Sequence, residues 1–219
     1  MTVIEFNFND DWMGEISRRL GDLNDKTPDV ISQATNSTAR KARKLIVQSL
    51  REHYAEDAKT KEYNAAMKIA RASRKKYDAT IYIRGKVQNL RRFNVSPKDP
   101  PASGSSRPPT TRAQVLLQGG LKELNKGGIK AFITTFKNGD VVVAQRNGSF
   151  YTYHRPTGGI DRHQAIDKLW SISIPKMAES QLDPKTVRGN MRDTIQAILV
   201  EEIEKQIARQ LAKHGGNAG

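Results

Sequence analysis

The Asn-Gly pair at positions 138 and 139 is the feature that most constrains how this chain can fold. It separates two apolar runs within residues 129–146, which read IKAFITTFKNGDVVVAQR. An Asn-Gly pair between two such runs is one of the strongest short-range signals for a β-hairpin. Because long helical patterns occur on both sides of this segment, we expect an α+β fold in which long helices pack a small antiparallel β-sheet.

The helical pattern on the N-terminal side of the hairpin begins at Thr27-Pro28. A cap residue followed by proline is a typical helix start, and the pattern predicts a helix that runs to about Tyr54. Its buried stripe is expected to combine apolar and small residues, namely Ile31, Ala34, Thr38, Ala42, Leu45, Ser49 and Leu50.

The helical pattern on the C-terminal side starts with the same signal, Asp183-Pro184. It predicts a long amphipathic helix over residues 183–214, and residues 215–219 are expected to form a disordered tail. The apolar positions of this helix are Val187, Met191, Ile195, Ile198, Leu199, Ile203, Ile207 and Leu211.

Shorter patterns predict further elements between and before the long helices. Ile4, Phe6 and Phe8 alternate with polar residues, as in a half-buried strand, and Asp10 then offers a cap for a helix. The remaining expectations are a short helix from Thr60 to about Arg71, a strand over 79–84 with 87–95 as its partner, and a strand over 113–117.

The domain organisation follows from a change of composition after residue 95. Residues 96–112 are rich in proline and serine and predict a long flexible loop. Strands are expected on both sides of this loop, so it is placed inside a domain rather than between two. We therefore expect a strand and helix extension over 1–24 and a single α+β domain over 25–214, with loops and arms that become ordered on assembly.

The charge of the chain points to a negatively charged partner. Lysine and arginine exceed aspartate and glutamate by 14, while hydrophobic residues make up 37% and aromatic residues 6%. Nucleic acid, or an acidic surface inside a larger assembly, would fit this balance. The absence of cysteine excludes disulfides and thiolate metal sites. Without a signal sequence or a run of about 20 apolar residues, we expect a soluble protein made in a cytoplasm, with no membrane partner.

Residues capable of catalysis form no recognisable cluster. The four histidines have no metal-ligand spacing, and His154 and His163 are interpreted as part of a polar surface loop. The glycine pairs in NKGGIK and PTGGID match no phosphate-binding loop and are interpreted as turns. The sequence thus predicts a protein that is not an enzyme and holds no cofactor or metal.

A basic segment over residues 71–92 is the strongest candidate for a binding surface. It contains eight cationic side chains and one aspartate, a net charge of +7, with Tyr77, Tyr82 and Phe93 in or beside it. Such a segment can follow a nucleic-acid backbone and stack on bases, although a run of charge is more often a solvated face. Contact with DNA or with an acidic partner is assigned to Arg71, Arg74, Lys75, Lys76, Arg91 and Arg92.

The order of these elements resembles the prophage minor tail protein Z family, the tail completion proteins of long-tailed phages. The local matches are Arg92-Phe93, the A-F-I…N-G hairpin followed by Arg146, and the segment LWSISIPKM at 169–177. Trp170 and Ser171 depart from the family pattern, residues 147–163 form an insertion, and residues 3–23 are an addition. The resemblance covers residues 27–211.

What the resemblance implies is a structural role in a virion. A family member would be a minor tail protein in an oligomeric ring, a hexamer, at the head-proximal end of the tail, where it serves head–tail joining and DNA passage. Its partners would be further copies of itself, the tail terminator, the head connector and neck proteins, the tape-measure protein and the packaged DNA. The alternative is a nucleic-acid-binding accessory protein that uses the basic residues 71–92.

The contacts of such a ring are expected at the hairpin, the 170–177 segment and the proline-rich loop. The residues predicted for this assembly interface are Phe132, Phe136, Val142, Trp170, Ile174, Pro175 and Met177.

Overall fold

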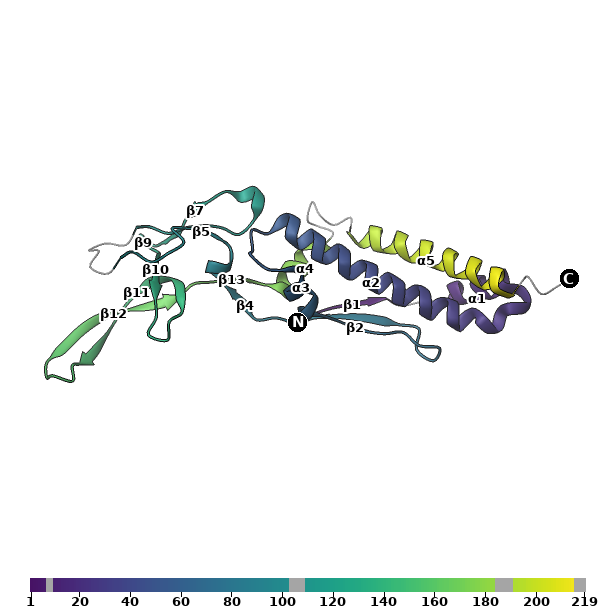
Figure 1. The fold of residues 1–219 in the computed structure, drawn as a ribbon, viewed down its shortest axis with the longest axis horizontal. Coiled ribbons are helices and arrows are strands. Elements are labelled where there is room, and N and C mark those ends of the chain that lie inside the picture. Colours follow the sequence, from purple (N-terminus) through teal and green to yellow (C-terminus); the bar gives the residue numbers. More distant parts are fainter. Residues whose placement is uncertain (7–9, 103–108, 184–190, 215–219) are drawn as a thin grey trace. The chain divides into compact units, whose positions relative to one another are not determined.

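The computed structural model describes residues 1–6, 10–102, 109–183 and 191–214 of the chain. Helices and short antiparallel strands follow one another along it (Figure 1), which confirms the α+β class. Two compact units are present. The helical unit comprises Met1–Leu50, Lys59–Lys86 and Ile174–Gly219, and the sheet unit comprises Arg51–Ala58 and Val87–Ser173. The expectation of a single domain over 25–214 after an extension over 1–24 stays a prediction.

The helical unit combines helices with one three-stranded antiparallel sheet of order β1-β3-β2. In this sheet Ile83 of β3 lies opposite both Thr2 of β1 and Met67 of β2. The elements of the unit are β1 (Thr2–Phe6), α1 (Asp10–Leu20), the 3-10 helix η1 (Gly21–Lys26), α2 (Thr27–His53), α3 (Thr60–Ala66), β2 (Met67–Ala70), β3 (Ala79–Ile83), α4 (Ile174–Leu182) and α5 (Met191–His214).

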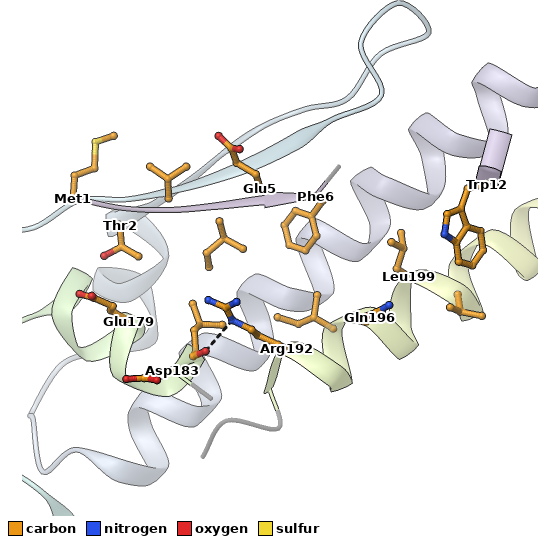
Figure 2. A pocket seen from close by; sticks show the side chains of 15 residues that line it. Met1, Thr2, Glu5, Phe6, Trp12, Glu179, Asp183, Arg192, Gln196 and Leu199 are labelled. Carbon is orange, nitrogen blue, oxygen red and sulfur yellow. Dashed lines mark hydrogen bonds between the residues drawn. The ribbon is translucent and has the colours of Figure 1, made fainter. Parts of the chain in front are cut away.

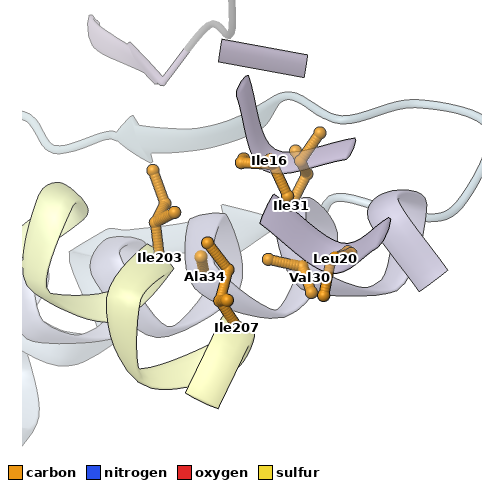
Figure 3. Packing of buried hydrophobic residues seen from close by; sticks show 7 residues of the cluster. All are labelled: Ile16, Leu20, Val30, Ile31, Ala34, Ile203 and Ile207. Atoms are coloured by element: carbon orange, nitrogen blue, oxygen red, sulfur yellow. The ribbon is translucent and has the colours of Figure 1, made fainter. Parts of the chain in front are cut away.

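The core of the helical unit lies where α1, α2 and α5 meet (Figure 3). Its buried residues are Ile16, Leu20, Val30, Ile31, Ala34, Ile203 and Ile207. Small residues of α2 such as Ala34 and Thr38 are fully buried, which permits close approach of neighbouring elements. Farther along α2, the Ser49 hydroxyl donates a buried hydrogen bond of 2.8 Å to the Gln181 side chain of α4. Most of the predicted stripe of α2 is therefore core.

Two predictions in this part of the chain are wrong. The short helix ends at Ala66 rather than near Arg71, because Met67–Ala70 pairs with β3 as strand β2 and buries Met67. Strand β3 is not paired with residues 87–95, because β1 and β2 occupy both of its edges. Residues 87–95 contain a 3-10 turn at Leu90–Arg92, where the Asn89 side chain accepts a hydrogen bond from the Arg91 amide and interrupts the strand.

The sheet unit is built from several small antiparallel sheets rather than one. Their strand orders are β10-β11-β12, β13-β4, β5-β6-β7 and β8-β9. The elements are β4 (Val87–Asn89), η2 (Leu90–Arg92), β5 (Asn94–Ser96), β6 (Arg112–Gln114), η3 (Leu117–Gly119), β7 (Lys122–Glu123), β8 (Asn125–Lys126), β9 (Ile129–Lys130), β10 (Phe132–Thr135), β11 (Val141–His154), β12 (Ile160–Lys168) and β13 (Trp170–Ser173). The strand predicted over 113–117 corresponds to β6 (Arg112–Gln114), which is shorter and begins one residue earlier.

The predicted hairpin is confirmed as β10 and β11, with Phe132 opposite Ala144. In its turn the Gly139 amide donates to the Phe136 carbonyl at 2.9 Å, and the Asn138 side chain accepts from the Asp140 amide at 3.1 Å. Gly139 has φ of +84°, a value that glycine adopts without strain. The Asn138-Gly139 pair therefore forms the turn of the hairpin, as predicted.

Some predictions concern residues that the structure does not describe. They are Phe8, the middle of the proline-rich loop at 103–108, the start of the last helix at 184–190 and the tail at 215–219. The described part of the last helix, α5, runs from Met191 to His214 and agrees with the predicted amphipathic segment.

Candidate assembly surfaces

The predicted interface residues differ widely in their exposure. Val142, Ile174 and Met177 are buried within this chain, as is Pro175, so their side chains contribute to its own core. Phe132 and Phe136 are half-buried in the β10–β11 hairpin, whereas 53% of Trp170 is exposed. Residues 170–173 belong to the sheet unit and residues from Ile174 onward to the helical unit. The assembly role of all seven residues stays a prediction.

The most exposed apolar surface of the sheet unit is the hairpin of β11 and β12, here named the aromatic arm (residues 146–168). Beyond Arg146, β11 pairs with β12 and no longer with β10, so this part of the hairpin is a two-stranded ribbon (Figure 1). The exposed fractions are 53% for Phe150, 54% for Tyr151 and 67% for Ile160. Tyr153 and Ile166 are also exposed.

Cations lie against aromatic rings along the aromatic arm and beside it. The Arg162 guanidinium is 4.3 Å from the centre of the Phe150 ring, and the Lys168 ammonium is 4.5 Å from the Trp170 ring. These contacts restrain side chains that no core holds in place. Tyr151 and Tyr153 both contact the His163 ring, at centroid distances of 5.7 and 6.1 Å.

The shape of the aromatic arm is set by local hydrogen bonds. At its base, two extra residues on β11 form a bulge between Arg146 and Phe150, closed by the Asn147 side chain, which donates to Asp167 at 3.1 Å. At its tip, Arg155 makes two hydrogen bonds to the Asp161 carboxylate, one of 2.6 Å, and these hold the pKa of Asp161 below its usual value. The tip glycines are turn residues, as predicted.

A groove with a volume of about 810 Å³ opens on the helical unit, here named the β1 groove (Figure 2). It lies among β1, Trp12 of α1, the end of α4 and the first turns of α5. Apolar side chains such as Phe6, Ile195 and Leu199 line it. The Thr2 hydroxyl anchors β1 to α4 by donating to the Pro175 carbonyl at 3.1 Å. On the α5 side, Arg192 donates to the Leu182 carbonyl at 3.0 Å.

The basic residues predicted to contact DNA are divided between the two units. Residues 71–76, here named the basic loop, connect β2 and β3 in the helical unit, and Arg91 and Arg92 belong to the sheet unit. In the basic loop, Arg71, Lys75 and Lys76 are exposed. The predicted cluster of residues 71–92 is therefore not one continuous element.

Several of the predicted cations have roles within the fold. The Arg74 Nε lies 3.0 Å from an Asp29 carboxylate oxygen, which ties the basic loop to α2. The Asn36 side chain of α2 exchanges two hydrogen bonds of 3.0 Å with the backbone of Ala72. In the sheet unit, the Arg92 Nε lies 3.3 Å from the fully buried carboxylate of Glu56. Contact of these cations with DNA stays a prediction.

Arg91 is held on the surface of the sheet unit. Its Nε donates to the Lys98 carbonyl at 3.4 Å, and its guanidinium lies 3.6 Å from the Asp99 carboxylate. The proline-rich loop is therefore connected to the 3-10 turn that carries Arg91 and Arg92.

The described part of the chain offers no grouping of three or more histidine, cysteine, aspartate or glutamate residues suited to a metal ion. His154 and His163 are exposed as predicted, but they lie on strands β11 and β12 of the aromatic arm rather than in a loop, and His163 Nε2 is 3.9 Å from Asp161. Within the same described residues, none of the helices has both the length and the apolar character to cross a bilayer.

The aromatic arm and the β1 groove were not among the predicted interface residues. A signal for the arm was present in the run SFYTYH, where Phe150, Tyr151 and Tyr153 place large apolar groups on both faces of a strand. No local signal identifies the groove, because its lining residues come from four elements that are distant in the sequence.

One of the comparisons with known proteins identifies a family. A family model, Prophage minor tail protein Z (GPZ), matches residues 15–214 of the chain. No curated protein and no solved structure matches it. The match includes α2, the basic loop, the hairpin, the aromatic arm and α5. Since it extends over nearly the whole sequence, the chain belongs to the prophage minor tail protein Z family.

Proposed function

We propose that this minor tail protein is a tail completion subunit that forms a ring at the head-proximal end of the tail. The observation that carries the proposal is the family match over residues 15–214. In this role a ring of identical subunits, six to match the tail, ends the tail tube so that it can join a filled head. The ring then encloses the path of the DNA.

Two features of the chain support a role in an assembly. Large apolar side chains are exposed on the aromatic arm, and exposed apolar surface of this kind marks a site of protein contact. The arm and the β1 groove are different surfaces of one chain, and contacts between unlike surfaces generate closed rings or filaments. The tail terminator, the head connector and neck proteins and the tape-measure protein are the proposed neighbours.

An add-back experiment tests this role. In a parent phage that lacks this protein, we expect electron microscopy to show filled heads and full-length tails that have not joined. Addition of the purified chain should restore joined, infectious particles. Joined and infectious particles in the absence of the protein would contradict the proposal.

The basic loop is proposed to face the DNA or an acidic partner, because Arg71, Lys75 and Lys76 are exposed on it. Reversing the charge of these three residues should reduce infectivity while tails still form. Reversing Lys44, Lys59 and Lys61, three exposed lysines of the same unit, is the matched control. Full infectivity of the basic-loop variant would remove the DNA assignment.

The same loop supports a second candidate function, a nucleic-acid-binding accessory protein. This candidate requires that the free chain binds DNA and that the affinity falls steeply as the salt concentration rises. A tail subunit should bind weakly or not at all as a free protomer. Fluorescence anisotropy with labelled single-stranded and duplex DNA over a salt series distinguishes the two functions.

A further inference from the structure

We propose that the aromatic arm of one copy of this chain docks in the β1 groove of a second copy, where strand β12 pairs with the open edge of β1. The inference rests on the proposed self-assembly and deepens it, because it identifies the two surfaces that would join neighbouring subunits. It assigns a role to residues 147–163, which the family resemblance leaves as an insertion.

Eight of the fourteen exposed large apolar side chains among the described residues lie at these two places, and others, such as Leu116, Leu117 and Leu121, lie elsewhere in the sheet unit. In the sheet unit, the aromatic arm carries five of the exposed large apolar side chains, and exposed Trp170 lies two residues beyond its end. In the helical unit, the exposed large apolar side chains of the described residues are Met1, Val3, Val200 and Leu211, and the first three line the β1 groove. Docking the arm in the groove would bury both surfaces together.

Each of the two surfaces also contains a strand with one edge that is not paired with another strand. Strand β12 is an edge strand in the order β10-β11-β12, and β1 is an edge strand in the order β1-β3-β2. Open strand edges pair readily with a strand from another chain. Residues 160–164 of β12 pair with residues 150–154 in the outer part of the arm, and β1 also has five residues, so the lengths agree.

The side-chain charges are complementary. The aromatic arm contains Arg146, Arg155, Arg162 and Lys168 against Asp161 and Asp167, which leaves +2. The charged side chains that line the β1 groove are Glu5, Glu179, Asp183 and Arg192, and their net charge is −2. Opposite charge around apolar contacts favours the correct partner and orientation.

A second copy fits the arm better than DNA does. Ile160 and Ile166 are aliphatic and cannot stack on bases as aromatic rings do, but they can fill an apolar groove. A groove of about 810 Å³ is in the upper part of the range of roughly 300–1,000 Å³ in which proteins bury compact ligand groups. It can therefore accept several side chains of the arm.

The chain has no cysteine, so single cysteines can be introduced to test the contact. Ile160→Cys is placed on the arm and Val3→Cys on β1, both at exposed positions. When the two purified single variants are mixed with a bis-maleimide reagent, we expect a dimer joined between the different variants. The matched control pairs Ile160→Cys with Val87→Cys, which is exposed but outside the groove. A cross-link with Val87→Cys that equals the one with Val3→Cys would overturn the proposal.

A mixing experiment tests the direction of the contact. Tyr151→Ser with Ile160→Ser weakens the arm, and Val3→Glu with Val200→Glu weakens the groove. Each variant alone should associate at least about tenfold more weakly than the unaltered chain, the usual effect of losing central apolar contacts. A mixture should form one-to-one dimers and nothing larger, because each pair has one intact arm and one intact groove. Sedimentation velocity measures all of these species.

Three results would overturn the inference without affecting the add-back test of the proposed function. The first is that the unaltered chain stays monomeric at every concentration. The second is that the doubly substituted Val3→Cys, Ile160→Cys chain cross-links within itself under dilute conditions. The third is that the arm variant self-associates normally but loses affinity for DNA, which would assign the arm to DNA. Failure of the add-back test together with a specific cross-link would instead remove the tail completion role and leave the arm contact in place.

Discussion

The helical unit and the sheet unit bury their apolar residues very differently. Among the largest fully buried side chains of the described residues, Ile133 is the member from the sheet unit, and the others belong to the helical unit. The exposed large apolar side chains show the opposite distribution, since most of them belong to the sheet unit. The helical unit therefore holds most of the large buried side chains, and the sheet unit, with a smaller core around Ile133, Val142 and Val143, presents more apolar surface that a partner can bury.

This difference has a topological cause. Helices α1, α2 and α5 bring apolar stripes together over many turns, and this gives a continuous cluster. The sheet unit is divided into sheets of two or three strands, and a two-stranded ribbon such as the aromatic arm has little of its own core to pack against. The stability of the chain should therefore depend mainly on the helical unit, whereas the aromatic arm of the sheet unit should contribute to assembly and little to stability.

The largest effect is expected from the same substitution made once in each unit. Ile31→Ala removes a fully buried side chain from the core of the helical unit and should lower the free energy of unfolding by about 2–5 kcal/mol. Ile160→Ala on the aromatic arm should change it by less than about 0.5 kcal/mol. Urea denaturation followed by circular dichroism measures both. Equal losses would show that the arm belongs to the folded core.

A second comparison concerns two cations that were both predicted to contact DNA. Arg92→Ala removes a cationic partner of the buried Glu56 carboxylate and should destabilise the chain by about 1–3 kcal/mol. Lys75→Ala, on the exposed basic loop, should leave the stability unchanged. Thermal unfolding of the two variants measures the difference. An unchanged melting temperature for Arg92→Ala would mean that Glu56 does not depend on this pair.

A third comparison uses two glycines. Gly139→Ala places a Cβ on a residue with φ of +84° and should destabilise the hairpin by about 1 kcal/mol. Gly14→Ala, inside α1 where a Cβ meets no neighbour within 4 Å, should stabilise the helix by about 0.5–1 kcal/mol. Denaturation midpoints should move in opposite directions, and a shift in the same direction would contradict the described turn.

The smallest effect is expected on the pH dependence of the free energy of unfolding. Burial of Glu202 raises the pKa of its carboxyl, but the hydrogen bond and charge of Lys41, 2.7 Å away, outweigh burial and lower it overall. A pKa lower in the folded than in the unfolded state contributes stability above the ordinary glutamate value of about 4.3, and this is lost as the pH falls below it. When the free energy of unfolding is plotted against pH, Glu202→Gln should therefore show a smaller loss than the unaltered chain as the pH falls below this value.

The control for this profile is Glu204→Gln, which breaks the exposed pair with Arg19 at 2.5 Å. The pKa of Glu204 is also lowered, by the hydrogen bond from Arg19, but solvent screens an exposed pair. We expect Glu204→Gln to alter the profile less than Glu202→Gln. The reverse order would mean that Lys41 and Glu202 do not form a stable pair in solution.

The sequence alone determined the features that depend on a few neighbouring residues. Thr27-Pro28 marked the start of α2, although the Thr27 hydroxyl does not form the predicted cap; Asn138-Gly139 marked the β10–β11 turn, and the apolar spacing after Met191 marked α5. In each of these, the signal and the structure that it specifies lie within one or two turns of chain. Together with the family match, they were sufficient for the α+β class and the tail protein family.

Only the tertiary structure decided which of these elements meet. It placed β3 between β1 and β2, extended residues 67–70 into a strand, and buried Val142 and Met177 in the chain's own core. It also brought β1, α4 and α5 together around the β1 groove. These outcomes depend on pairing and burial between residues far apart in sequence, and such contacts override weak local preferences.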